Sequence, residues 1–341
     1  MKRWGSLIGT LIVLALLVYV LWGINFYEIY LLIAQANLIW FALAILCSFL
    51  TFIIWNFRWK YIFRKLFKGD FWYLLHVLLA GAFFNTVTPG AGIGGEPFRA
   101  HFLAKKYKKP HTKILGYILG DKIFQLAILG FFTLFSIFFV LIYVKISSNL
   151  KLILELLLIF VVVSFVVILF LTLRKVKFNL GLMFKRLHWF KFINSRFVTS
   201  EDFVKYIDKR INMFSGVFRK VVKDKKNIFV GISFSVVFWM LNFFVAYFLF
   251  LSFGYDVNFL NVVIVITLSN LIGAVSIIPG GVGVIEGSIT LLFSAMGIPS
   301  ALALLVAFMN RIIYYFFALF IGGMSLVHLR RKQNGSKFGL F

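Results

Sequence analysis

Residues 89–96 read PGAGIGGE, and residues 279–286 read PGGVGVIE. Each stretch follows a long apolar segment and carries a glutamate seven residues after its proline. Proline removes a backbone donor and glycine tolerates positive φ, so both stretches are predicted to unwind the chain. Unwound backbone at membrane depth is tolerated chiefly where it lines a cavity, which favours a binding site over two purely structural turns.

The segments around these stretches are those of an integral membrane protein. Of the 341 residues, 62% are hydrophobic and 19% are aromatic, well above the composition of soluble domains. A membrane helix needs about 20 apolar residues. Six segments meet this length, at 6–23, 38–57, 114–144, 152–173, 228–253 and 301–328, and two shorter ones at 71–88 and 259–278 end at the Pro-Gly stretches. We therefore expect an all-α, polytopic membrane protein with about eight membrane segments.

The basic residues predict how the chain crosses the bilayer. The net charge is +25, and the Lys and Arg residues gather at 2–3, 58–68, 105–113, 174–226 and 330–337. The positive-inside rule places all five clusters in the cytoplasm, with both termini. The same rule explains the charge without nucleic acid, for which no recognition motif is present. We expect a multi-pass protein of the cell membrane.

This topology requires two re-entrant hairpins. The chain must leave the cytoplasm after Lys68 and return by Lys105, yet 71–104 is too short for two full spans. A hairpin with its tip at 89–96 fits this length. The same reasoning gives a second hairpin of opposite orientation within 259–300, with its tip at 279–286.

The two hairpins belong to a repeat with a period of about 190 residues. A span begins 51 residues before each proline, at 38 and 228, and a polar pair follows each tip, at 121–122 and 310–311. One membrane domain, 1–341, would then hold repeat one at about 38–144, a basic cytoplasmic linker at about 174–226, and repeat two at about 228–328. Inverted repeats with broken helices are typical of secondary transporters.

The tips and their flanks supply the candidate site residues. A carboxylate at membrane depth is costly unless it is protonated, paired or in water. Glu96 has Arg99 one turn away, and a structural ion pair is as good an explanation as a substrate role. For Glu286 the candidate partners are Arg311 and Lys122. Converging cations would suit a phosphate, and a titrating glutamate could couple transport to protons. The predicted tip residues are Pro89, Gly90, Gly92, Gly95, Pro279, Gly280, Gly281 and Gly283, and the predicted substrate-binding residues are Glu96, Arg99, Lys122, Glu286 and Arg311.

Other chemistries are not supported by the sequence. Gly90, Gly92 and Gly95 form a literal G-x-G-x-x-G, but an apolar helix precedes it and the acidic residue of a dinucleotide site is missing. The single cysteine and the five histidines show no metal-ligand spacing. We expect no cofactor, no metal and no enzymatic activity. Gly116 and Gly120 form a GxxxG, expected to serve close helix packing more than a dimer face.

The segment 174–226 carries 15 Lys or Arg residues against four acidic residues, with aromatic residues interleaved. This mixture is typical of cytoplasmic helices that lie on an anionic leaflet, although a plain linker between the repeats is the alternative.

The motifs NTVTPGAGIGGEPFRA (85–100), IIPGGVGVIEGSITLLFSAMGIP (277–299) and NRIIYYFFALFIGG (310–323) resemble the lysylphosphatidylglycerol synthase transmembrane-region family, also called flippase-like or UPF0104 membrane proteins. The resemblance covers nearly the whole chain. It implies a flippase domain with re-entrant segments, which in the best understood members moves aminoacylated phosphatidylglycerol to the outer leaflet beside a soluble transferase domain. The chain ends soon after its last span, so we expect translocation without synthesis. Asp121-Lys122 stands where the family pattern suggests Glu-Arg, which weakens any role for Lys122.

We therefore expect a lipid flippase or transporter that moves an anionic phospholipid or a polyprenyl-linked or glycolipid between leaflets. The alternative is a membrane scaffold for a lipid-modifying enzyme. A homo-oligomer is compatible with either function.

Overall fold

The structure, a computed structural model, describes residues 26–88, 94–143, 158–159, 162–163, 200–275 and 278–334. Within these residues the chain is helical and contains no strand, in agreement with the predicted all-α class. Several predicted features lie outside the described residues: the span 6–23, most of 152–173, the linker residues 174–199, and the tip residues Pro89, Gly90 and Gly92.

Among the described residues, four helical runs are long and apolar enough to cross a membrane. They are α3 (Leu38–Phe63), α6 (His111–Tyr143), α11 (Lys225–Ser252) and the run from α14 (Ser300–Tyr315) through a π-helical turn (Phe316–Ile321) to α15 (Gly322–Asn334). These runs lie where the sequence predicts spans, although α3 continues six residues beyond the predicted end at 57. The π-helical turn, which the hydrophobic pattern does not reveal, often marks functional positions in membrane helices.

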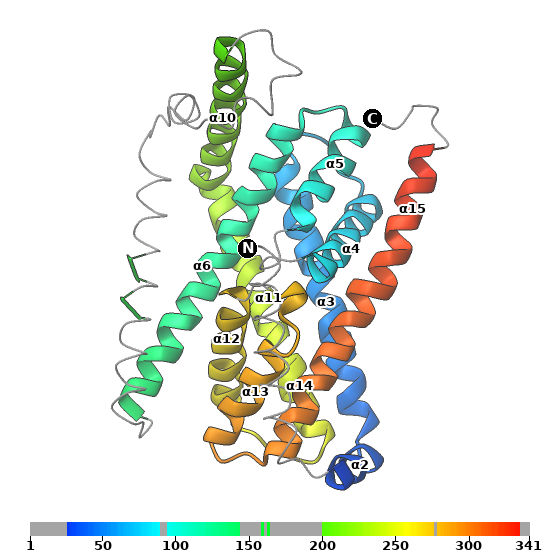
Figure 1. Cartoon of the computed structure of the whole chain (residues 1–341), viewed down its shortest axis with the longest axis vertical. Coiled ribbons are helices and arrows are strands. Elements are labelled where there is room, and N and C mark those ends of the chain that lie inside the picture. The colour runs from blue at the N-terminus through cyan, green and yellow to red at the C-terminus, as the bar shows by residue number, and fades with distance from the viewer. Residues whose placement is uncertain are drawn as a thin grey trace.

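Other helices of the bundle are shorter, and four of them pack in consecutive pairs that form two helical hairpins. In the first pair α4 (Phe71–Val87) is followed by α5 (Gly95–Tyr107), and in the second α12 (Phe259–Val275) is followed by α13 (Val284–Ala295). Figure 1 shows α4 and α5 in one half of the molecule, and α12 and α13 in the opposite half. The turn Pro279–Gly281 contacts α4, whose Thr86 carbonyl oxygen lies 3.3 Å from where a Cβ on Gly280 would be. The ends of the two hairpins therefore meet inside the bundle.

The core is built around α3 and α11, which pack along each other. Its largest cluster of buried side chains is rich in aromatic and β-branched residues of α11, α12 and α14. Phe243, Phe250 and Phe293 are fully buried there, and the rings of Phe250 and Phe293 meet edge to face with their centroids 4.8 Å apart. This core includes Ile289 and Phe293 of α13, so the second hairpin packs against it.

The basic segments that the structure describes gather at one end of the molecule. The α5–α6 connection, α10 (Ser200–Lys223) and the end of α15 lie together at the top of Figure 1, whereas α2 (Phe26–Ala34) and the connection from α11 to α12 lie at the bottom. The upper segments carry many lysines and arginines, and residues 253–258 carry none. The charge of these described segments is therefore asymmetric along the long axis.

Helix α10 packs against α6 through small residues. A Cβ on Gly116 would lie 3.1 Å from Val217, and one on Gly120 would lie 2.9 Å from Val221. The expectation that this GxxxG serves close helix packing is confirmed. Residues 200–223 of the predicted linker thus form a helix docked on the bundle.

Gly120→Leu is expected to destabilise the protein by about 1–3 kcal/mol, because the added side chain must displace Val221 at a closely packed contact. Gly130→Leu on the same helix is the matched control, since a Cβ there meets nothing within 4 Å. Thermal unfolding of both variants in detergent tests this, and equal midpoints for the two would contradict the α6–α10 contact.

Asp224 starts α11 as its N-cap, accepting a hydrogen bond from the Lys226 backbone N–H at 3.0 Å and pairing with the Lys65 ammonium. The hydrogen bond from Lys65 is the main cause that lowers the pKa of Asp224 below its ordinary value of 3.8. A carboxylate with a depressed pKa stabilises the fold above its unfolded-state pKa, and this contribution is lost as the pH falls through the folded pKa.

We expect Asp224→Ala to lower the free energy of unfolding by about 1 kcal/mol above pH 5, and Asp224→Asn, which keeps the cap, to lower it less. Unfolding measured at pH 7 for both variants tests this, and an equal loss would refute the capping role.

Candidate functional site

Two adjoining cavities occupy the centre of the bundle, where the hairpin ends meet. One encloses about 310 Å³ and reaches Glu96, and the other encloses about 340 Å³ and reaches Arg311. The cavities share a wall, lined in both by Ser48, Asn85, Gln125, Phe238, Trp239, Asn242, Asn270 and Tyr314. They therefore form one continuous space between the two hairpins, lined by both polar and apolar side chains.

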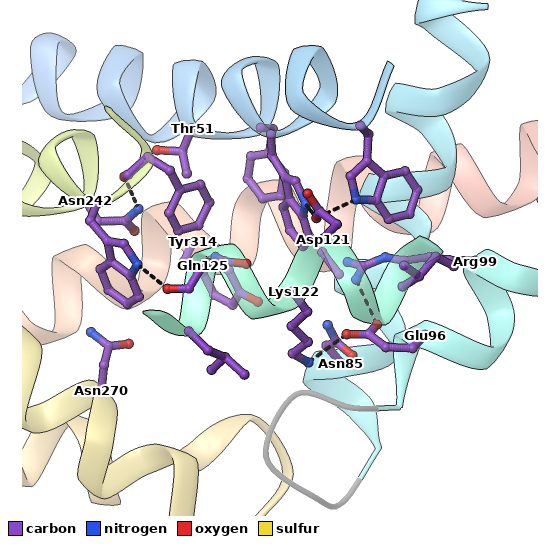
Figure 2. Close-up of a pocket in the computed structure, with 18 of the residues that line it drawn as sticks. Thr51, Asn85, Glu96, Arg99, Asp121, Lys122, Gln125, Asn242, Asn270 and Tyr314 are labelled. Carbon is purple, nitrogen blue, oxygen red and sulfur yellow. Dashed lines mark hydrogen bonds and ion pairs between the residues drawn. The ribbon is translucent and has the colours of Figure 1, made fainter. Parts of the chain in front are cut away.

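The first end of this space is a carboxylate between two cations. Glu96 stands in the first turn of α5, with its Oε2 2.8 Å from Arg99 Nη1 and its Oε1 2.7 Å from Lys122 Nζ on α6. Glu96 and Arg99 are almost fully buried, whereas the Lys122 side chain is 26% exposed. Figure 2 shows Lys122 reaching across the cavity edge toward Glu96. Lys122 is thus the cation of this group that is most accessible from the cavity.

Arg99 is held by several other contacts. Its Nη2 donates to the Leu78 carbonyl oxygen at 3.3 Å, and its guanidinium lies over the Trp55 ring, 4.6 Å from the centroid. A Cβ on Gly81 would come within 1.9 Å of Arg99 Nε, so glycine on α4 makes room for this side chain. Such cation–π and hydrogen-bond contacts make Arg99 part of the framework as well as of the cavity wall.

A second buried pair adjoins this group. Arg58 Nε lies 2.7 Å from Asp121 Oδ1, and Asp121 Oδ2 accepts hydrogen bonds from Arg58 Nη2 at 3.0 Å and from Trp59 Nε1 at 2.9 Å. Trp55 Nε1 lies 3.3 Å from the same oxygen, and Arg58 Nη1 donates to Ser235 Oγ at 2.6 Å. Arg58 is fully buried, which its inclusion in the basic cluster at 58–68 does not anticipate. It belongs to a network that joins α3, α6 and α11.

The sequence pattern does not predict this network, for a physical reason. Arg58 lies near the end of an apolar segment, where the positive-inside rule counts a basic residue as a flank. Its partner Asp121 is 63 residues away, beyond any helical spacing. The signal that could have revealed the pair is the tryptophans Trp55 and Trp59 beside Arg58, because indole N–H groups need acceptors when they are buried.

The other end of the space is built on the second hairpin. Glu286 stands in the first turn of α13, and its Oε1 lies 3.0 Å from Arg311 Nε on α14. Arg311 Nη2 donates to the Gly280 carbonyl oxygen at 3.0 Å. Arg311, 13% exposed, lines the cavity, whereas Glu286 lies behind it. Of the two candidate partners of Glu286, Arg311 is therefore the observed one, and Lys122 is not, since it pairs with Glu96.

The second tip is unwound, as the sequence predicts. Gly280, Gly281 and Gly283 have φ values of 63°, 66° and 80°, which glycine adopts readily and other residues rarely do. Two backbone N–H groups of this tip are bonded within the protein. The Gly281 N–H donates to the Ile278 carbonyl oxygen at 2.9 Å, and the Gly283 N–H donates to Glu286 Oε2 at 2.7 Å. These two N–H groups are therefore not available to a ligand in the observed conformation.

Gly95 of the first tip has a comparable packing role. A Cβ at this position would lie 2.1 Å from the Gly81 carbonyl oxygen, and the Gly95 N–H donates to Asn85 Oδ1 at 2.6 Å. Glycine here lets α5 begin directly against α4 and so places Glu96 at the cavity. Asn85 then contributes to both hairpin packing and the cavity wall.

Neutral amides line the space between the two charged ends. Asn242 Nδ2 donates to the Phe238 carbonyl oxygen and Asn270 Nδ2 to the Ile266 carbonyl oxygen, each at 2.7 Å. Figure 2 shows both amides, with Gln125, around the cavity. These residues are polar positions inside apolar segments, a signal that the sequence contains but that its motifs do not emphasise.

The electrostatics of the first end favour an anion. Arg58, Arg99 and Lys122 bring three formal positive charges against the two negative charges of Glu96 and Asp121, a net of +1. Glu286 and Arg311 balance each other at the second end. A phosphate could bind at Lys122, with charge-assisted hydrogen bonds that are stronger than neutral ones. Among the described residues, no group of three or more His, Cys, Asp or Glu side chains is arranged to hold a metal ion.

Comparison with known proteins gives a consistent picture. Residues 6–322 match the family described as the lysylphosphatidylglycerol synthase TM region. A UPF0104 membrane protein of Pyrococcus horikoshii is 26% identical over 331 residues, covering 95% of this chain and 96% of the relative. A UPF0104 membrane protein of Methanocaldococcus jannaschii is 28% identical over 336 residues, covering 97% and 96%. A phosphatidylglycerol lysyltransferase of Staphylococcus aureus is 34% identical over 101 residues, 29% of this chain and 12% of that protein.

Proposed function

Because the chain belongs to the lysylphosphatidylglycerol synthase transmembrane-region family, we propose that it moves a lipid with a phosphate headgroup between membrane leaflets through the central cavity. The substrate is an anionic phospholipid or a polyprenyl-linked or glycolipid phosphate. No catalytic step is part of this proposal.

The observation that carries the proposal is the charged, polar cavity in the middle of an apolar helix bundle. Ionisable residues at membrane depth are expensive and commonly mark substrate pathways. A purely structural role explains the buried Arg58–Asp121 pair, but it does not explain why Lys122 and Arg311 line a cavity. The cationic excess at Glu96, Arg99 and Lys122 suits a phosphate. The amides between this end and the Arg311 end of the cavity suit a polar headgroup that crosses the cavity.

The two ends of the cavity support the proposed inverted repeat. In each half a glutamate in the first turn after the Pro-Gly stretch pairs with a cation on the following helix: Glu96 with Lys122, and Glu286 with Arg311. Lys122 follows Glu96 by 26 residues, and Arg311 follows Glu286 by 25 residues. Two re-entrant hairpins that meet near the midplane would give alternating access from the two leaflets.

We place the basic end of the molecule in the cytoplasm of the cell, with both termini, because positively charged connections face inward in membrane proteins. In this orientation α10 lies next to the anionic leaflet. The hairpin α4–α5 would enter from the cytoplasmic side, and α12–α13 from the outside.

Proteoliposomes test the proposal against the alternative of a non-transporting scaffold. Labelled phosphatidylglycerol is placed in both leaflets of vesicles, and a membrane-impermeant reductant reports which label is outside. We expect label to cross in vesicles that contain the protein, and not in protein-free vesicles. Tight binding of anionic lipids without any crossing, for phosphatidylglycerol and for a polyprenyl phosphate, would favour the scaffold.

A further inference from the structure

A third cavity lies apart from the central space, between α5, α6 and α10 at the basic end of the molecule. It encloses about 360 Å³, within the size range of ligand-binding pockets. We propose that this groove binds one anionic phospholipid of the adjacent leaflet, with the phosphate at Arg210 and an acyl chain along the apolar wall. This groove is separate from the central cavity.

The walls of the groove are mostly apolar. They are formed by Pro97 and Ala100 of α5, Leu115 of α6, and Ile211 and Phe214 of α10. The side chains of Leu115, Ile211 and Phe214 are partly exposed, although each belongs to a helix that packs on its neighbours. An acyl chain of a membrane lipid would cover this apolar surface.

The polar rim of the groove carries positive charge. Arg210 Nη1 donates to Thr112 Oγ1 at 3.1 Å, which fixes the guanidinium at the edge of the apolar wall. His111 completes the rim, and its ring lies 5.6 Å from that of His101. Further lysines follow along the chain at the end of α5, in the connection and at the start of α6: Lys105, Lys106, Lys108, Lys109 and Lys113. This charge complements an anionic headgroup, for which arginine is well suited because its planar donors match phosphate oxygens.

The apolar wall and the cationic rim together identify the occupant. A soluble anion would not need the apolar wall, and an apolar peptide would not need the cationic rim. A membrane phospholipid needs both, and the amphipathic α10, which forms one side, is of the type that lies at a membrane surface.

The groove is also placed to supply the central cavity, which extends the proposed transport function. His111 and Leu115 line the groove, whereas Ile118, Lys122 and Gln125 line the central space. These five positions are spaced three or four residues apart, so they form one stripe along α6. Pro97 and Ala100 likewise directly follow Glu96 and Arg99 on α5. A lipid in the groove would be separated from the Lys122 site by the α5–α6 contact alone.

The test is native mass spectrometry of full-length protein titrated with phosphatidylglycerol in detergent. It is carried out in the Lys122→Met background, so that the central site does not mask the groove. We expect one bound lipid, and a roughly tenfold or greater loss of its affinity in Arg210→Gln, since a hydrogen bond to a charged group contributes this much. Ala100→Trp, which fills the apolar part, should give a comparable loss. Lys209→Gln, an exposed neighbour on α10, is the matched control and should bind as the background protein does.

Three results would overturn the groove as a lipid site: affinity unchanged in Arg210→Gln and Ala100→Trp, equal affinity for phosphatidylcholine, or displacement by millimolar inorganic phosphate alone. These outcomes are independent of the transport assay. The protein could fail to move lipid in the transport assay and still lose groove binding in these variants. That result would support the lipid groove and refute transport.

Discussion

Asp121→Ala should destabilise the fold by about 3–5 kcal/mol, the largest loss expected for any single substitution at the charged network. Asp121 is 2% exposed and satisfies Arg58, Trp59 and Trp55. Its removal leaves the fully buried Arg58 guanidinium without its counter-ion, and the uncompensated charge accounts for most of the cost.

A double substitution separates this charge effect from a loss of packing. In Arg58→Met/Asp121→Leu both charges are replaced by apolar side chains, and we expect a smaller loss than in Asp121→Ala, because buried ion pairs are often replaceable by apolar residues as a unit. Asp256→Ala, an exposed position in the connection after α11, is the control and should change stability by no more than about 0.5 kcal/mol. The measurement is unfolding in detergent. Equal stability of Asp121→Ala and Asp256→Ala would refute a structural role for the pair.

Lys122→Met should slow the movement of an anionic lipid by about tenfold or more while leaving the protein folded. The reason is that Lys122 is the accessible cation at the first end of the cavity, and a charge-assisted hydrogen bond to phosphate is worth about 1.5–3 kcal/mol. Its loss leaves Glu96 paired with Arg99, so the buried carboxylate keeps a counter-ion. Methionine preserves the apolar part of the side chain.

Lys122 is a sharper test than Arg99 or Arg311. Neutralising Arg99 would remove its contacts with the Leu78 carbonyl group and with Trp55, and neutralising Arg311 would remove its bond to Gly280. Either change could reduce transport through damage to the fold. Lys225→Met, an exposed lysine at the start of α11, is the control for the change of charge. Rates are compared in proteoliposomes at equal protein content, and wild-type rates for Lys122→Met would exclude its role in phosphate binding.

Local spacing was enough to predict part of the site. Glu96 and Arg99 are one helical turn apart, so their pairing follows from the sequence once α5 is recognised as helical. The glycines of 279–286 predict positive φ, and the structure shows it at three of them. Helical periodicity and span length likewise predict α3, α6, α11 and the α14–α15 run, because these are long, apolar segments.

The parts that could not be predicted depend on contacts between distant helices. Lys122 follows Asp121 along the chain, yet one pairs with Glu96 on α5 and the other with Arg58 on α3. Adjacent residues on a helix point to different faces, and the sequence does not state which helix each face meets. The amides Asn242 and Asn270 lie on two different helices, α11 and α12. Only the packing of the bundle brings them to one cavity.

The spacing that caps α13 at the second tip is visible in the sequence, although the motifs did not predict it. Glu286 lies three residues after Gly283, the spacing at which a side chain reaches back to the first backbone N–H of a helix. The carboxylate therefore has a local structural partner in addition to Arg311. This double role makes Glu286 less suited to a substrate role than Lys122.

The most direct test of the central claim, that lipid passes through the cavity, is transport in a variant whose cavity is filled. Gln125 lines both adjoining cavities, and Gln125→Trp would add bulk where they meet. Phe131→Trp, at a lipid-facing position of α6 that is 61% exposed, is the matched control. In the leaflet-resolved assay with labelled phosphatidylglycerol we predict wild-type rates for Phe131→Trp and a loss of about tenfold or more for a folded Gln125→Trp, equivalent to about 1.4 kcal/mol in the barrier. Wild-type rates in Gln125→Trp would contradict passage through this cavity.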